Sequence, residues 1–169
     1  DGTLSSTKAI AVTVTAVNDN TPVITSSATA NVAENTTAVM TVTATDADLP
    51  AQTLTYSIVG GADAAKFAIN SSTGALSFAT APDYEAPSDV GSNNVYDVTV
   101  QASDGTLSST KAIAVTVTAV NDNTPVITSG ATANVAENTT AVMTVTATDA
   151  DLPAQTLTYS IVGGADAAK

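Results

Sequence analysis

Apolar and polar residues alternate along much of the chain. In residues 95–102, Tyr96, Val98, Val100 and Ala102 fall on one face of an extended segment, because successive side chains of a strand point to opposite sides. The same alternation recurs in residues 38–44, 54–58 and 112–120. No stretch keeps the 3.6-residue apolar spacing of an amphipathic helix over a useful length. The pattern therefore predicts a protein built from strands.

Seven strands are predicted, separated by short segments rich in turn-forming residues. They cover residues 23–33, 37–45, 53–59, 66–70, 75–79, 94–103 and 109–120. Ser71-Ser72-Thr73-Gly74, between the fourth and fifth strands, predicts a hairpin turn. Consecutive strands without intervening helices are typical of two packed antiparallel sheets. We therefore expect an all-β, seven-stranded Greek-key β-sandwich of the immunoglobulin-like class.

The chain contains a long internal repeat. Residues 1–66 recur as residues 104–169, at an offset of 103, and the copies differ only where Ser27 corresponds to Gly130. A solenoid unit has roughly 20–50 residues, whereas a complete sandwich domain has about 100. The sequence therefore predicts tandem repeats of 103 residues, each burying its own core.

The Pro-containing stretches at residues 18–22 and 121–125 are the predicted joints between repeats. On this division, residues 1–22 are the last strand and linker of a preceding repeat. Residues 23–125 form a complete domain with its linker, and residues 126–169 are the first part of the following repeat. The two flanking pieces lack the strands that would cover their apolar faces, so neither is expected to fold well alone. We therefore expect the chain to be a window from a longer array.

The composition argues against several classes of function. The 16 acidic and 4 basic residues give a net charge of -12, which argues against a nucleic-acid partner because phosphate contacts need Lys and Arg. The absence of Cys and His argues against a disulfide framework, the usual zinc and haem sites, and His-dependent catalysis. No apolar run approaches the roughly 20 residues needed to insert into a membrane. The acidic excess indicates either simple solubility or carboxylates gathered around a hard cation such as calcium.

Most carboxylates of the complete domain lie at strand ends. They are Glu34, Asp46, Asp48, Asp83, Glu85, Asp104 and Asp122. Carboxylates two residues apart in a loop can converge on one ion, which takes 6–8 oxygen ligands when it is calcium. A single Asp is equally well explained by its preference for turns, but that explanation is weak for five separate segments. Asp63, Asp89 and Asp97 fall outside the pattern and are expected to be ordinary surface charge.

Six short motifs follow one another in a fixed order. They are Ala33-Glu34-Asn35, Asp46-Ala47-Asp48, the hairpin from Phe67 to Leu76, Asp83-Tyr84-Glu85, Ala102-Ser103-Asp104-Gly105 and Asn121-Asp122-Asn123-Thr124-Pro125. In this order and spacing they resemble a cadherin repeat over the full period. The near-identical copies and the Thr/Ala/Val-rich composition without Arg are similar to the extender repeats of giant bacterial (RTX-type) biofilm adhesins.

The resemblance implies about two to three calcium ions (Ca2+) at each joint, bound by the end of one domain, the linker and the start of the next domain. For the second joint the implied ligands are Glu34, Asp83, Glu85, Asn121, Asp122, Asn123, Asp149 and Asp151. For the first joint they are Asn18, Asp19, Asn20, Asp46, Asp48 and Asp104. The sequence departs from the family at Ala119, at Pro82 and in the loop of residues 49–52, and these departures bear on the number and strength of the sites.

The function implied by the resemblance is that of a calcium-stiffened extracellular spacer, an extender, in a large cell-surface adhesin. Its partners would be neighbouring identical repeats of the same chain. The alternatives are a directly adhesive module and a module that self-associates into a filament or sheath. Catalysis is not expected, because Asp83 and Glu85, the one pair that suggests a glycosidase, lie two residues apart in a loop and are more simply explained as ligands of one ion.

Overall fold

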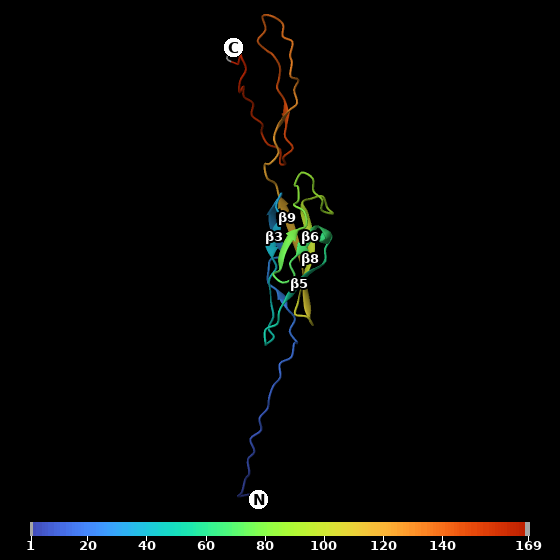
Figure 1. Cartoon of the computed structure of the whole chain (residues 1–169), viewed down its shortest axis with the longest axis vertical. Coiled ribbons are helices and arrows are strands. Elements are labelled where there is room, and N and C mark those ends of the chain that lie inside the picture. The colour runs from blue at the N-terminus through green and yellow to red at the C-terminus, as the bar shows by residue number, and fades with distance from the viewer. Residues whose placement is uncertain (1, 168–169) are drawn as a thin grey trace.

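The computed structural model describes residues 2–167. These residues form an elongated molecule, in which a central β-sandwich separates an extended N-terminal segment from a C-terminal segment (Figure 1). No helix in the described part of the chain is long and apolar enough to cross a membrane.

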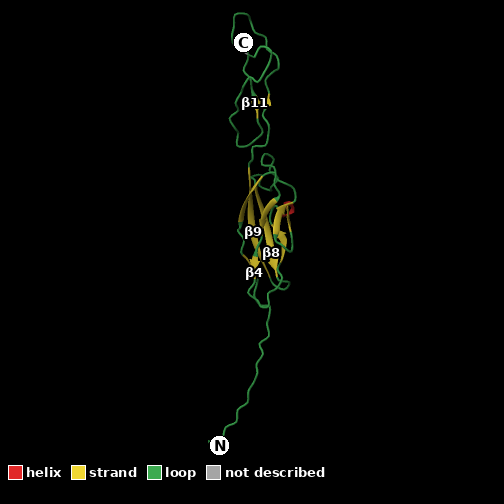
Figure 2. Cartoon of the chain, turned by 60° about the vertical axis from the view of Figure 1, so that its left-hand side comes forward, coloured by secondary structure: helices red, strands yellow, loops and turns green. Residues whose placement is uncertain are grey.

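The sandwich consists of two sheets. The first sheet has four strands in the order β2 (Thr29–Ala33), β9 (Ser108–Thr118), β8 (Val95–Ser103) and β5 (Thr55–Gly60). The second has three strands in the order β3 (Ala38–Thr41), β7 (Ala75–Phe78) and β6 (Phe67–Ile69). The strands run along the long axis of the molecule (Figure 2). The prediction of an all-β, seven-stranded sandwich is confirmed.

The remaining elements are short. Strand β1 (Val23–Ile24) pairs with β4 (Ala44–Thr45), and β10 (Val126–Ile127) pairs with β11 (Ala147–Thr148). A single 3-10 turn, η1 (Ala64–Lys66), precedes β6. The predicted strand at residues 23–33 is therefore divided in two, because β1 pairs with β4 whereas β2 pairs with β9. The β2–β9 pairing is parallel, and the other sheet pairings are antiparallel.

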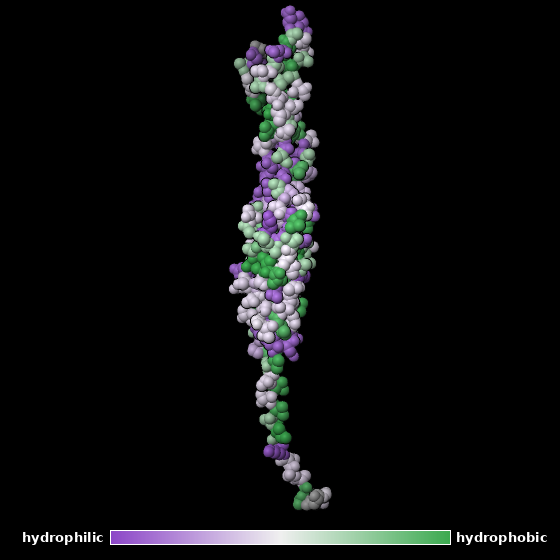
Figure 3. All heavy atoms as spheres, turned by 90° about the vertical axis from the view of Figure 1, so that its right-hand side faces the viewer, coloured by the Kyte–Doolittle hydropathy of each residue, from purple (hydrophilic) through white to green (hydrophobic). Residues whose placement is uncertain are grey.

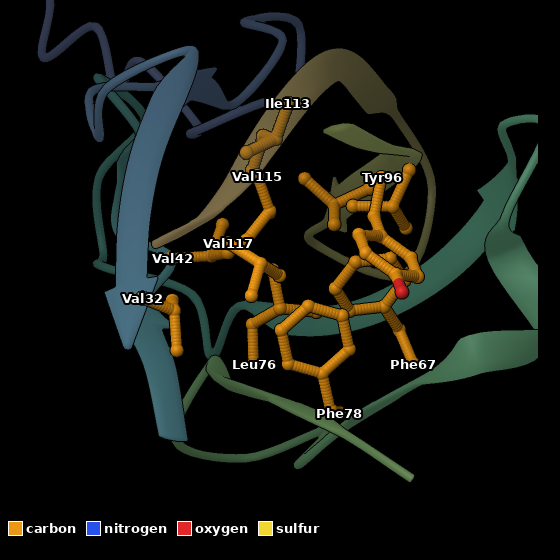
Figure 4. Packing of buried hydrophobic residues seen from close by; sticks show 11 residues of the cluster. Val32, Val42, Phe67, Leu76, Phe78, Tyr96, Ile113, Val115 and Val117 are labelled. Carbon is orange, nitrogen blue, oxygen red and sulfur yellow. The ribbon is translucent and has the colours of Figure 1, made fainter. Parts of the chain in front are cut away.

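The core lies between the inward faces of the two sheets. Alternate residues of β8 and β9 are buried, including Val98, Val100 and Val115. Phe67 stacks on Phe78 with 4.7 Å between the ring centroids, and the Tyr96 ring meets both rings edge-on. Figure 4 shows the three rings grouped on one side of the cluster and the labelled Val side chains on the other. Few aromatic residues are needed because β-branched side chains fill most of the core.

Residues 5–15, which repeat the sequence of β9, show that strand formation here depends on pairing with neighbouring strands. They have the same sequence as Ser108–Thr118, yet none of residues 2–22 belongs to a strand. Ile10, Val12 and Val14 are exposed, whereas the corresponding residues of β9 are buried. Figure 3 shows hydrophobic residues along this N-terminal segment. The sequence therefore forms a buried strand only where β2 and β8 flank it.

Gly74, in the β6–β7 hairpin, is a position where the fold leaves no room for a side chain. Its φ is +71°, and a Cβ atom would lie 2.1 Å from the Val42 carbonyl oxygen. We expect Gly74→Ala to lower the free energy of unfolding by about 2 kcal/mol or more, since strain and a backbone clash act together. Urea denaturation measures the change. The control is Gly60→Ala, whose nearest new contact is 3.8 Å away; an equal effect of both substitutions would contradict this account.

Candidate metal sites at the joints between repeats

Glu34 is the buried carboxylate at the end of β2, with 2% of its surface exposed. Its Oε2 accepts a hydrogen bond from the Tyr84 N–H at 2.8 Å, and its Oε1 accepts one from the Val120 N–H at 2.6 Å. The next residue, Asn35, has φ of 61° and donates through Nδ2 to Asp122. Glu34 thus ties the end of a strand to the loop at residues 82–85 and to the linker.

Two groups of carboxylates meet at this end of the sandwich. Glu34, Asp83 and Glu85 form one group, and Glu85, Asp122 and Asp151 form the other; within each group the candidate ligand oxygens lie within 4.8 Å of one another. Glu85 belongs to both groups, so they form one continuous acidic site. The site draws on the sandwich, the linker and the following repeat. Like charges this close repel strongly unless a cation or protons compensate them.

The linker is held to the following repeat through Asp151. Its Oδ1 accepts hydrogen bonds from the Asn123 N–H at 3.0 Å, Asn123 Nδ2 at 2.8 Å and the Asp122 N–H at 3.3 Å. Asp151 is 1% exposed, and among the described residues its Oδ2 is a buried oxygen that accepts no hydrogen bond. A buried, unpaired carboxylate oxygen beside two other carboxylates is the donor set that suits a hard cation.

A third carboxylate group lies at the predicted first joint, at the other end of the sandwich. Asp46, Asp48 and Asp104 bring candidate ligand oxygens within 4.8 Å of one another. Asn20 donates through its N–H to Asp48 at 3.0 Å and also through Nδ2. The Asn18 amide lies 3.0 Å from both Asp48 Oδ2 and Asp104 Oδ2, and its nitrogen can donate to both. In the described part of the chain Asp46 Oδ2 is again buried and without a hydrogen bond.

Hydrogen bonds to the carboxylates favour their charged forms. The Asn20 side chain lowers the pKa of Asp48, and the Asn123 side chain lowers the pKa of Asp151, both against the opposing effect of desolvation. The backbone N–H groups of Thr106 and Leu107, each 2.7 Å from Oδ1, lower the pKa of Asp104. These carboxylates are therefore ionised, and able to bind a cation, throughout the neutral range.

Some of the predicted ligands lie outside the carboxylate clusters. Asp149 accepts the Asp151 N–H at 3.1 Å instead of joining a cluster. Its copy, Asp46, accepts the Asp48 N–H in the same way and also clusters with Asp48 and Asp104. Asp19 accepts a hydrogen bond from Asn20 Nδ2 at 3.2 Å. Asn121 donates to Gln155 at 2.6 Å.

The prediction of surface charge is wrong for two acidic residues. Asp63 and Asp89 are buried, with 4% and 5% of their surface exposed. Asp63 accepts the N–H groups of Val90 at 2.8 Å and Asp97 at 2.9 Å. Asp89 accepts the N–H groups of Asn93 and Asn94, both at 3.0 Å. For Asp89 the signal is its position just before the Gly and Asn residues of a tight turn, where a carboxylate commonly accepts nearby backbone N–H groups. Asp63 offers no such signal, because its donors lie 27 and 34 residues away.

Asp89 also supports the acidic site from a distance. Asp89 fixes Asn94, and Asn94 Nδ2 donates to the Tyr84 carbonyl oxygen at 3.0 Å. Tyr84 lies between Asp83 and Glu85 and donates its N–H to Glu34. The loop carrying the two ligands is therefore held from both sides by hydrogen bonds to its backbone.

Comparison with known proteins identifies the family. Residues 28–118, more than half of the chain, match the Cadherin domain. This chain belongs to the cadherin domain family. Human Protocadherin Fat 1 is 37% identical over 174 aligned residues, which cover 95% of this chain and 4% of that protein. Human Cadherin EGF LAG seven-pass G-type receptor 2 is 36% identical over 158 residues, covering 88% of the chain and 5% of the receptor. The cadherin chain thus spans a small fraction of these relatives.

Solved cadherin structures share the fold. Extracellular cadherin domains 3-6 of Protocadherin Gamma B2 align with a TM-score of 0.61 at 29% identity, covering 82% of this chain and 37% of that chain. Human Protocadherin-24 EC1-2 aligns with a TM-score of 0.62 at 25% identity, covering 80% and 62%. Cadherin domains are structural adhesion modules, and the acidic clusters of this one can hold metal ions.

Acidification should release the linkers only below the ordinary Asp range. The pKa values of Asp48 and Asp151 are lower in the folded chain than their usual 3.8. Their contribution is therefore fully present above pH 3.8 and is lost as the pH falls through the lower folded value. We expect the Asn20 and Asn123 amide signals, followed by NMR in chelator, to change with midpoints below pH 3.8. Asp48→Asn should remove the transition at Asn20 alone, and midpoints above 3.8 would contradict the assignment.

Proposed function

We propose that this cadherin chain is part of an extender, a spacer array in a large extracellular cell-surface adhesin, and that calcium at its joints stiffens the array. One observation carries the proposal: Glu85 belongs to both carboxylate groups of the second joint. It connects Glu34 and Asp83 of one domain with Asp122 of the linker and Asp151 of the next repeat. A cation bound there would hold two domains and their linker at once.

The donor atoms favour calcium. The candidate ligands supply carboxylate and amide oxygens, and the chain has no Cys or His to offer a softer metal. Calcium accepts irregular sets of 6–8 oxygens, whereas magnesium requires a near-ideal octahedron. We assign about two to three calcium ions to a complete joint, held at the second joint by Glu34, Asp83, Glu85, Asn121, Asp122, Asn123, Asp149 and Asp151.

Stiffening follows from electrostatics. Contacts between domains of one chain are usually small and permit relative motion. Without a cation, the carboxylates of Glu85, Asp122 and Asp151 repel one another, which weakens the contact between the two repeats and lets them rotate relative to each other. With calcium bound, the same groups become ligands of a common ion, and each repeat loses its freedom to rotate. The cation thereby converts a flexible string of domains into a rod.

The sequence supports a bacterial context for this array. Its two copies agree at every aligned position except Ser27 and Gly130, and its basic residues are all Lys. This composition and near identity suit an extender of a biofilm adhesin, whose role is to project a distal binding domain from the cell. Under this proposal residues 23–125 are one complete repeat with its linker, residues 1–22 close the preceding repeat, and residues 126–169 open the following one.

Chelation should shorten the array. For a protein with several complete repeats of this sequence, we expect small-angle X-ray scattering to give a smaller radius of gyration and a broader size distribution once a chelator removes calcium. Returning calcium should restore the rod, whereas sodium chloride at matched ionic strength should not. An array whose maximum dimension is the same with calcium and with chelator is not stiffened by the cation, and the proposal would fail.

Glu85→Gln should weaken calcium binding on the order of tenfold or more, because it removes the charge shared by both carboxylate groups. Isothermal titration calorimetry measures the loss. Asp97→Asn is the matched control, since it removes one negative charge from an exposed strand position outside all three clusters. Equal losses for the two variants would show that net charge, and not this site, governs binding.

A further inference from the structure

We infer that the loop from Leu152 to Gln155 makes a direct protein contact with the repeat beneath it, and that this contact persists as a hinge when no cation is bound. Two hydrogen bonds carry the inference. The Leu152 N–H donates to Glu85 Oε1 at 2.9 Å, and Asn121 Nδ2 donates to Gln155 Oε1 at 2.6 Å. The loop therefore reaches both the sandwich and the linker. These contacts link protein groups alone.

The same loop sequence occurs twice in the chain, so its two environments can be compared. Residues 46–52 have the same sequence as residues 149–155, but only the second copy has the top of a sandwich beneath it in this chain. Leu152 is 49% exposed, whereas its copy Leu49 is 76% exposed. Since the two loops have identical residues, the lower exposure of Leu152 reflects its surroundings, in agreement with a contact with the neighbouring repeat. Burial and hydrogen bonding thus point independently to the same interface.

The contact involves the carboxylate that the two groups at this joint share. Glu85 belongs to both carboxylate groups, and the Leu152 N–H occupies its Oε1. A donated N–H offsets part of the negative charge that would otherwise separate the repeats. The loop therefore positions Glu85 and holds the following repeat close when no cation is bound.

Amide exchange tests the contact in the 169-residue chain. The Leu49 and Leu152 amides have the same flanking residues, so their intrinsic exchange rates are equal, and NMR can distinguish them with Leu49→Val as the assignment variant. In the presence of a chelator, we expect the Leu152 amide to exchange at least severalfold more slowly than the Leu49 amide. Glu85→Ala should abolish the difference, whereas Asp97→Ala should leave it unchanged.

A second pair of variants tests the other hydrogen bond. Gln155→Ala should speed exchange at Leu152 by severalfold, and Gln52→Ala, the same change in the other loop, should leave Leu152 unaffected. Equal rates at the two leucines in chelator, or protection of Leu152 that appears only with calcium, would overturn the inference. It rests on the proposed function only in taking successive repeats to be stacked end to end. Its failure is distinguishable, because the scattering measurement can still show stiffening when the amides exchange alike.

Discussion

The organisation of the joint depends on a single buried carboxylate. Both oxygens of Glu34 are occupied by backbone N–H groups from segments far apart in the sequence, Tyr84 and Val120. A buried charge is tolerated only where such donors compensate it. If Glu34 were not satisfied in this way, neither the ligand loop nor the linker would have a fixed place, and Glu85 would not reach the carboxylates of the next repeat.

A common device recurs through the acidic site. One oxygen of a carboxylate accepts backbone or amide hydrogens, and the other is buried near further carboxylates without a hydrogen bond. Asp151, bound by Asn123, and Asp46, bound by the Asp48 N–H, show it among the described residues. The donors keep the groups ionised and fix their rotamers before an ion arrives. Pre-organisation of this kind reduces the conformational entropy lost on binding. It also explains how so many like charges can be gathered without a basic side chain among them.

Alternation and repetition predict most of the fold. The buried face of β8 was predicted from Tyr96, Val98, Val100 and Ala102 alone. The division of the first strand was not predictable, because β1 and β2 differ in their partners rather than in their residue types. The same limit applies to Asp63, whose burial depends on backbone groups supplied from positions far along the chain.

At the candidate site, spacing identified the carboxylates that the structure brings into three clusters. It could not identify Gln155, because a neutral side chain after a Pro carries no signal of a contact with another repeat. Nor could the sequence distinguish the role of Asp149 from that of Asp151, because both are Asp residues of one Asp-x-Asp motif. Their environments differ because Asp151 accepts hydrogen bonds from the linker, whereas Asp149 accepts one from Asp151.

The parallel pairing of β2 with β9 has a consequence for the array as a whole. A domain whose first and last strands ran antiparallel would begin and end at the same pole, and successive domains would fold back on one another. Here β2 and β9 point the same way, so the chain enters the sandwich at one pole and leaves at the other (Figure 1). In an array of the kind proposed, every repeat would therefore add its full length to the reach of the protein, in proportion to the number of copies.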